Sequence, residues 1–254
     1  MKKLAGHIRD YIAARCSHDE VFQVETIGRL VDGDFTGSMS YGEVMKHGDF
    51  GLGTFVDLDG EMAAADGKFW HFGPGGHGNP VSPETRTPFA VVKFFTPDIT
   101  FQLDGPCTME ELEKAVDTHL PVKEQLCAVR AKGRFRSAHF RVVLRQDHPS
   151  TLAEAAKTQS EQDMVALEGQ LVGFRFPGDS APVEVPGYHL HLIADEGRIG
   201  GHFHGGTMED LTVEIDLSDH LHLAAHDAMQ RLDAGMSQTK KAELEAAERK
   251  RHKD

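Results

Sequence analysis

The segment PGYHLHLIADEGRIGGHFHGG, residues 186–206, carries four histidines within sixteen residues, as two H-x-H pairs on either side of DEGR. Side chains two residues apart in a strand point to the same face of a sheet, so each pair presents two imidazoles together. DEGR, residues 195–198, has the composition of a turn between two strands. The segment therefore predicts a β-hairpin with one histidine face and one apolar face.

The turn also predicts how the two strands pair. With DEGR as the connection, His191 lies opposite His202, and His189 lies opposite His204. Directly opposed residues have Cβ atoms about 4.5–5.5 Å apart, which brings all four imidazoles within reach of one ion. Imidazole suits Zn, Fe, Ni or Cu, and the pattern does not choose among these metals.

The number of histidine ligands decides the kind of metal site. Three histidines leave one coordination position open, as in catalytic zinc sites, whereas four tend to close the site. The hairpin alone leaves both alternatives open. The remaining histidines in similar contexts have no matching histidine strand, and we predict surface or packing roles for His47, His77, His220 and His222.

Composition limits the classes of partner. The chain has 254 residues, a net charge of −13 and 39% hydrophobic residues, as expected for a globular protein. Such an acidic chain is a poor ligand for nucleic acid, whose binding depends on phosphate neutralisation. No apolar run approaches the roughly 20 residues that span a bilayer, and charged residues interrupt the start where a signal peptide is apolar. We expect a cytoplasmic protein with no nucleic-acid or membrane partner.

The three cysteines, Cys16, Cys107 and Cys127, are odd in number and far apart. This arrangement fits reduced thiols better than disulfides or a C-x-x-C zinc site. The cysteines therefore add no second metal site to the histidine hairpin.

The rest of the chain predicts an α+β fold with two domains. Strand-like runs and glycine-rich turns fill the first part, and FAVVKFF (89–95) fits a buried strand. Capping boxes begin helices at Thr108 and Thr151, and residues 4–15 fit an amphipathic helix. We predict a mixed-sheet domain over 1–129 and, over 130–254, an antiparallel sheet carrying the hairpin.

Several blocks resemble the acetolactate decarboxylase family. PGYHLHLIADEGRIGGH is similar to its metal-binding segment, with a PGYHLHF strand and a GGH return. ETIGRLVDGDFTGSMSYGEVMKHGDFGLGTFVDLDGEM is similar to its N-terminal block, and TPFAVVKFF and FRVVLRQ also match. The resemblance covers roughly residues 20–216, in order and at similar spacing. It implies decarboxylation of 2-acetolactate to acetoin and carbon dioxide, with Zn²⁺ as cofactor, and a homodimer.

The resemblance also implies the site residues. Its motifs assign the zinc ligands to His189, His191 and His202, a catalytic glutamate to Glu61 and substrate contacts to Thr54 and Arg141. Arg141 also carries a catalytic role. In the family a further glutamate from the C-terminal tail folds back towards the metal, and the ELEAAE pattern assigns this role to Glu248, although the polar tail by itself reads as a frayed, solvated end.

One position departs from the family pattern. After the third ligand the family continues with a VLDF-like stretch, whereas this chain has Phe203, His204 and two glycines. His204 is a bystander, a donor to a ligand, or a fourth ligand that closes the site. The fourth-ligand alternative predicts a zinc-binding or sensor homologue that does not decarboxylate. A further alternative is a cupin-like module, since HLHLIADE offers an H-x-H followed by Glu196.

The implied chemistry needs no organic cofactor. 2-Acetolactate is a β-keto acid, so its own ketone accepts the electrons left by carbon dioxide as an enediolate. Zinc supplies Lewis acidity, and Arg141 offers a planar fork of N–H donors to an anion. Glu61 acts as a proton shuttle, assisted by Glu248. Thr54 orients the substrate through one hydrogen bond.

Overall fold

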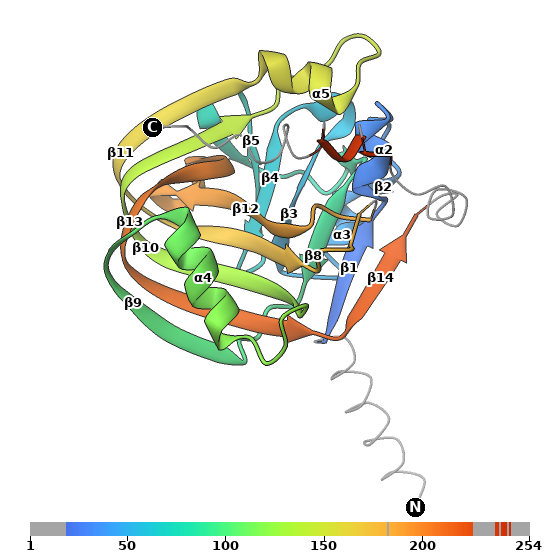
Figure 1. Ribbon diagram of the computed structural model, residues 1–254. Coiled ribbons are helices and arrows are strands. Elements are labelled where there is room, and N and C mark those ends of the chain that lie inside the picture. The colour runs from blue at the N-terminus through green and yellow to red at the C-terminus, as the bar shows by residue number, and fades with distance from the viewer. Residues whose placement is uncertain (1–18, 182, 226–236, 239, 243, 245–254) are drawn as a thin grey trace, which may run out of the picture.

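The computed structural model describes residues 19–181, 183–225, 237–238, 240–242 and 244 (Figure 1). Within them the fold is dominated by two β-sheets with few and short helices. None of these helices has the length and apolar character that a membrane crossing needs. Three predictions lie outside the described residues: the helix over 4–15, the state of Cys16 and the place of Glu248.

The first sheet has seven strands in the order β14-β1-β8-β3-β4-β5-β6. Its neighbours are antiparallel except for the parallel pair β1–β14, so the sheet is mixed, but β14 comes from outside the range 1–129 predicted for the mixed-sheet domain. The strands are β1 (Glu20–Val24), β3 (Phe50–Thr54), β4 (Glu61–Ala65), β5 (Lys68–Phe72), β6 (Gly78–Pro80), β8 (Ala90–Lys93) and β14 (His220–Ala224). A separate two-stranded ribbon pairs β2 (Met39–Ser40) with β7 (Arg86–Thr87).

The second sheet has five antiparallel strands in the order β10-β11-β12-β13-β9, and β10 also pairs with β13. This extra pairing closes β10, β11, β12 and β13 into a ring, which Figure 1 shows as a strongly curved layer. The strands are β9 (Ile99–Cys107), β10 (Leu126–Val142), β11 (Ser160–Phe176), β12 (Gly187–Ala194) and β13 (Ile199–Ser218).

The helices are short, and Leu112 and Val116 of the helix over 109–119 belong to the hydrophobic core of the second sheet. Both predicted capping boxes are confirmed. The hydroxyls of Thr108 and Thr151 each accept a hydrogen bond from the backbone N–H of the glutamate three residues later, and that glutamate's carboxylate accepts one from the backbone N–H of the threonine. The labelled α-helices are α2 (Ile27–Val31), α3 (Tyr41–Val44), α4 (Met109–His119) and α5 (Leu152–Ala155), and the described residues 238, 240–242 and 244 are also helical. The 3-10 turns are η1 (Val56–Leu58), η2 (Pro74–Gly76), η3 (Ala156–Thr158) and η4 (Asp195–Gly197).

The histidine hairpin forms as β12, η4 and β13, and its predicted register is half right. His191 lies opposite His202, as predicted. His189 does not lie opposite His204, because the pairing of β12 with β13 ends at His202. From Phe203 onward β13 pairs with β10 instead, through a register shift beside His139. The ring of His189 therefore reaches His202 diagonally.

Two glycines of β13 permit its close approach to β10. Gly201 has φ +152°, and a Cβ there would lie 2.5 Å from the carbonyl oxygen of Arg141. Gly206 has φ +141°, and a Cβ there would lie 2.2 Å from the carbonyl oxygen of Ser137. Both contacts are shorter than side chains tolerate, so glycine at these positions keeps Arg141 directly opposite His202.

Each sheet contains a strand from the other part of the chain. β9 precedes residue 129 yet joins the second sheet, and β14 follows residue 130 yet joins the first. One buried hydrophobic cluster contains residues of both sheets, among them Leu52, Phe72, Val172 and Phe174. The sheets therefore share a core, and the division at residue 129 stays a prediction.

Candidate functional site

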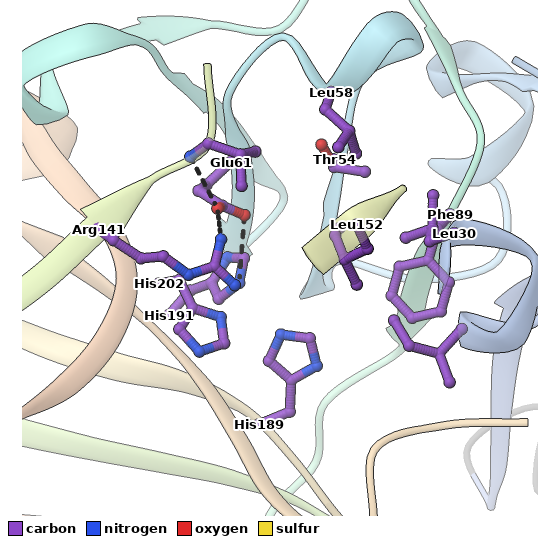
Figure 2. A pocket seen from close by; sticks show the side chains of 13 residues that line it. Leu30, Thr54, Leu58, Glu61, Phe89, Arg141, Leu152, His189, His191 and His202 are labelled. Atoms are coloured by element: carbon purple, nitrogen blue, oxygen red, sulfur yellow. Dashed lines mark hydrogen bonds and ion pairs between the residues drawn. The ribbon is translucent and has the colours of Figure 1, made fainter. Parts of the chain in front are cut away.

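Three imidazoles converge at the interface between the sheets (Figure 2). His189 and His191 come from β12 and His202 from β13, and one ring nitrogen of each lies within 4.8 Å of the others. Their ring centroids are 4.9–5.3 Å apart. All three side chains are buried. This group has the donor atoms and the spacing to hold a metal ion.

The hydrogen bonds of His191 fix which nitrogen faces the cluster. Its Nδ1 lies 2.8 Å from the carbonyl oxygen of Met62, which only accepts, so Nδ1 carries the proton and Nε2 keeps a lone pair. His191 Nε2 is buried without a hydrogen-bond partner among the described residues, and it lies 3.7 Å from Glu61 Oε2. A buried imidazole nitrogen that keeps its lone pair and has no hydrogen-bond donor among the described residues fits a metal ligand.

Burial favours the neutral form of two of these imidazoles, His191 and His202. It lowers the pKa of His191 well below 6.5, and the charge of His189 nearby acts in the same direction. Burial also lowers the pKa of His202 well below 6.5, helped by the guanidinium of Arg141 on the neighbouring strand. Metal ligation needs the unprotonated imidazole, so both side chains are in the form that binds metal.

A buried ion pair stands beside the histidines. Arg141 Nη1 donates to Glu61 Oε1 over 2.8 Å, and the backbone N–H of Val143 donates to the same oxygen over 3.2 Å. Glu61 begins β4 and Arg141 lies near the end of β10, so this contact joins the two sheets. It directs Glu61 Oε2 towards His191.

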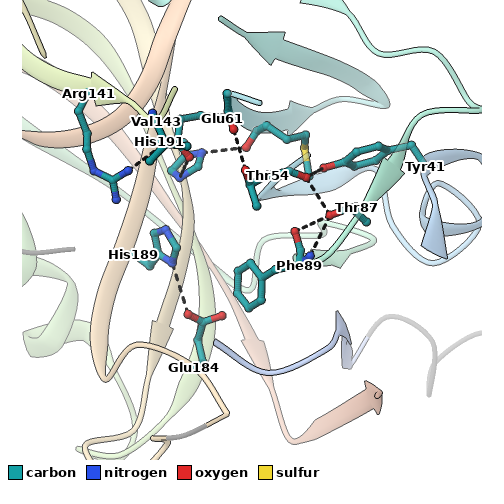
Figure 3. A network of polar contacts seen from close by, with 12 residues as sticks. Tyr41, Thr54, Glu61, Thr87, Phe89, Arg141, Val143, Glu184, His189 and His191 are labelled. Carbon is teal, nitrogen blue, oxygen red and sulfur yellow. Dashed lines mark hydrogen bonds and ion pairs between the residues drawn. The ribbon is translucent and has the colours of Figure 1, made fainter. Parts of the chain in front are cut away.

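Thr54 is the register partner of Glu61 on β3. Its hydroxyl donates to the carbonyl oxygen of Gly60 over 2.7 Å, while its own carbonyl accepts from Tyr41 and Thr87 (Figure 3). Because the hydroxyl proton is used by Gly60, Thr54 presents oxygen lone pairs to a ligand. Its hydrogen-bonding role towards a bound molecule would be that of an acceptor.

A single cavity unites these residues. It is lined by Thr54, Glu61, Arg141 and the three histidines, together with Gly53 and an apolar wall. The wall consists of Ile27, Leu30, Leu58, Phe89, Val143 and Leu152. Every site residue predicted from the sequence lines this cavity except Glu248, which lies outside the described residues.

His204 lies apart from this cavity. Its ring centroid is 5.1 Å from that of His202 and 5.6 Å from that of His139, but its nitrogens are not within the group of three. It lines a second, larger cavity with His139 and Asp163. In this arrangement three histidines face the first cavity, and the fourth faces the other.

Two further histidines and two cysteines among the described residues have packing roles. His47 stacks on Phe22, with ring centroids 3.8 Å apart, and half-exposed His222 meets the edge of the same ring. This agrees with the surface or packing roles that we predict for them. Cys107 and Cys127 are buried free thiols, as expected, and burial raises the pKa of Cys107 to about 11.

Sequence reasoning missed two groups that contact the histidines. The carbonyl oxygen of Met62 accepts from His191, and the carboxylate of Glu184 lies 3.4 Å from His189 Nδ1. A backbone carbonyl leaves no trace in the sequence. Glu184 offered one signal, a carboxylate five residues before the first H-x-H histidine.

The fold and site define a β-sheet protein with a candidate metal centre beside a buried arginine. Comparison with known sequences narrows this class, since the family described as Alpha-acetolactate decarboxylase matches residues 21–237. The chain belongs to that family, as its resemblance predicts, and its relatives indicate a decarboxylase. This membership sets aside the cupin-like alternative.

Named relatives cover most of the chain. The alpha-acetolactate decarboxylase of Methylococcus capsulatus is 39% identical over 90% of this chain and 88% of its own length. The alpha-acetolactate decarboxylase of Bacillus subtilis is 39% identical over 80% of this chain and 80% of its own length. A crystal structure of the Bacillus subtilis strain 168 enzyme matches with a TM-score of 0.85 and 34% identity, over 91% of this chain and 99% of that one.

Proposed function

We propose that this protein is a zinc-dependent decarboxylase that converts 2-acetolactate to acetoin and carbon dioxide. One observation carries the proposal: residues of five strands, far apart in the sequence, line one cavity. Thr54 and Glu61 come from the first sheet, and Arg141 and the three histidines from the second.

The donor set supports a metal. The three imidazoles converge, and the buried Nε2 of His191 has no hydrogen-bond partner among the described residues. Three histidine ligands leave coordination positions for substrate, as in catalytic zinc sites. Zinc is proposed because the family resemblance implies it. Bound there, zinc would supply Lewis acidity for the charge that develops on the substrate oxygens.

The residues around the histidines fit an anionic keto acid. Loss of carbon dioxide from 2-acetolactate leaves a negatively charged enediolate that must be stabilised and then protonated. Arg141 has a planar fork of N–H donors and lines the cavity, so it suits the substrate carboxylate or the enediolate. The buried site strengthens this attraction by excluding water.

Glu61 is the proposed proton shuttle. Its Oε1 is held by Arg141 and Val143, whereas Oε2 faces the histidine cluster. A proton carried at Oε2 is therefore delivered towards the cavity. Thr54, with its hydroxyl proton on Gly60, would accept a hydrogen bond from the hydroxyl group of the substrate.

Glu248 is proposed to assist Glu61 from the C-terminal tail. Support comes from the nearest described part of that tail. Leu244 is 2% exposed and belongs to the hydrophobic cluster that contains the cavity-lining residues Leu30, Phe89 and Leu152. An ion pair between Lys240 and Asp32 holds the same segment against the end of α2. Leu244, four residues before Glu248, thus packs with residues that line the cavity, which supports the assignment.

A homodimer and a cytoplasmic location complete the proposal, both carried over from the sequence. Size-exclusion chromatography with light scattering tests the dimer. A mass of about twice 28.0 kDa supports it, and a monomer contradicts it.

The activity is tested by incubating the purified protein with 2-acetolactate, with and without a chelator. We expect acetoin and carbon dioxide in equal amounts, loss of formation with the chelator and recovery with added zinc. Zinc binding without acetoin would instead support the sensor alternative. Acetoin formation that the chelator leaves unchanged would contradict the metal dependence.

A further inference from the structure

A buried carboxylate lies behind one of the three histidines. Glu184 Oε1 is 3.4 Å from His189 Nδ1, and Glu184 is 1% exposed (Figure 3). It does not line the cavity, so its carboxylate is on the far side of the imidazole from the ligand space. The contact therefore acts on the histidine itself.

The chain fixes this carboxylate firmly. The backbone N–H of Val185 donates to Glu184 Oε1 over 2.7 Å. The preceding carbonyl, of Val183, accepts from the backbone N–H of Ile27 over 2.9 Å and from Gln23 Nε2 over 2.7 Å. Both donors belong to the first part of the chain, and Gln23 is fully buried. The loop before β12 is thus tied to the opposite sheet.

The arrangement parallels that of His191, with one difference. In each histidine Nδ1 is directed at an oxygen, so Nε2 is the nitrogen that would bind a metal. For His191 the oxygen is the neutral carbonyl of Met62, whereas for His189 it belongs to a carboxylate. A carboxylate holds the ring orientation and also makes the opposite nitrogen a stronger electron donor.

We infer that Glu184 is a positioning residue of the metal centre, which orients His189 through Nδ1 and strengthens its binding of the metal. The inference rests on the proposed function, because it needs the three histidines to hold a metal. It assigns part of the metal affinity to a residue that touches neither the cavity nor the substrate.

The test measures metal affinity rather than turnover. Full-length protein is stripped with a chelator and titrated with Zn²⁺ against a chromophoric competitor, and Co²⁺ loading is followed by visible absorption. Glu184→Leu removes the acceptor, Glu184→Gln keeps an acceptor oxygen without the charge, and Glu196→Gln is the control. Glu196 is an exposed carboxylate of the same hairpin, in the turn η4.

We expect Glu184→Leu to weaken zinc binding by about 10- to 100-fold and to change the Co²⁺ spectrum. Glu184→Gln should fall between Glu184→Leu and the wild type, and Glu196→Gln should match the wild type. If Glu184→Leu does not fold, the loss of zinc affinity in Glu184→Gln tests the inference instead.

Wild-type affinity and spectrum in both Glu184 variants would overturn the inference while the proposed function stands. Loss of thermal stability without loss of affinity would overturn it too, because a purely structural role predicts that result. A wild-type protein that binds no zinc would overturn the proposed function and, with it, this inference.

Discussion

Two buried ion pairs join the two sheets, and they differ in what surrounds them. Lys93 on β8 contacts Asp216 on β13 over 2.5 Å, and Glu61 on β4 contacts Arg141 on β10 over 2.8 Å. All four residues are at most 4% exposed. By burial and charge alone the two pairs would be judged alike.

Their hydrogen bonds separate them. Lys93 Nζ donates to Asp216, to the carbonyl oxygen of Leu217 and to Ser218, and Thr96 donates to the second oxygen of Asp216. An ammonium has three N–H donors, so this pair is satisfied within the protein, and it lines neither cavity described above. The Glu61–Arg141 pair instead faces a cavity with three imidazoles. A buried ion pair indicates chemistry only where its groups face a space that a substrate can enter.

The comparison is tested most strongly at Glu61. Glu61→Gln keeps the shape of the side chain but removes the group that carries a proton. We expect zinc content to be retained and kcat for acetoin formation to fall by about 10²- to 10⁴-fold, the range for general acid–base catalysis. Metal analysis and steady-state kinetics measure both, with Glu196→Gln as the control. Unchanged turnover would remove the catalytic role of Glu61.

The matching change in the other pair is Lys93→Met. It leaves the carboxylate of Asp216 buried without its cation, and we expect a loss of about 3–5 kcal/mol in the free energy of unfolding. Because this pair faces no cavity, zinc content and kcat per folded molecule should stay at wild-type values. Denaturant unfolding measures the free energy of unfolding, metal analysis measures the zinc content and steady-state kinetics measure kcat.

The double variant Lys93→Met with Asp216→Leu is the control, and it should recover part of the stability, since both charges are gone. Loss of zinc from folded Lys93→Met would show that the two pairs are not separate in function.

A smaller effect concerns pH. The pKa values of His191 and His202 are lowered in the folded protein, chiefly by burial. Below pH about 6.5 these two histidines therefore bind protons in the unfolded chain but not in the folded chain. The metal-free protein should therefore lose stability as pH falls from 6.5, by up to about 1.4 kcal/mol per pH unit for each histidine.

Unfolding of chelator-treated protein by urea at pH 7.5, 6.5 and 5.5 measures this slope. His202→Gln lacks one of the two imidazoles, so its slope below pH 6.5 should be shallower than that of the wild type. Equal slopes would show that His202 is not kept neutral by the fold.

The smallest effect is expected at His204, which faces the second cavity. His204→Leu should keep one zinc per chain and change zinc affinity by less than the roughly tenfold that loss of a supporting contact typically causes. Zinc competition titration checks this prediction. A loss of zinc comparable to that in a ligand variant would instead make His204 a fourth ligand and close the site.

Short-range periodicity predicted part of the hairpin. The two-residue repeat and the DEGR turn predicted that His191 faces His202. The same reasoning failed for His189 and His204, because β13 leaves β12 to pair with β10, a strand about sixty residues earlier in the sequence. Such a distant pairing leaves no local pattern.

The other site residues depended on different information. Thr54, Glu61 and Arg141 came from the family motifs, since a single glutamate in a turn or arginine in a strand has no signature of its own. The carbonyl of Met62 and the carboxylate of Glu184 reach the histidines only through the packing of two sheets. No spacing in the sequence brings positions 62 and 191 together.

The central claim is that three histidines hold a metal on which acetoin formation depends. Zinc content and acetoin formation, measured together in the wild type, His191→Ala and His202→Ala, test it most directly. We expect about one zinc per chain and acetoin formation in the wild type. Each variant should lose both, because only two of the three imidazoles then remain at the site. Full zinc retention in both variants would contradict the claim.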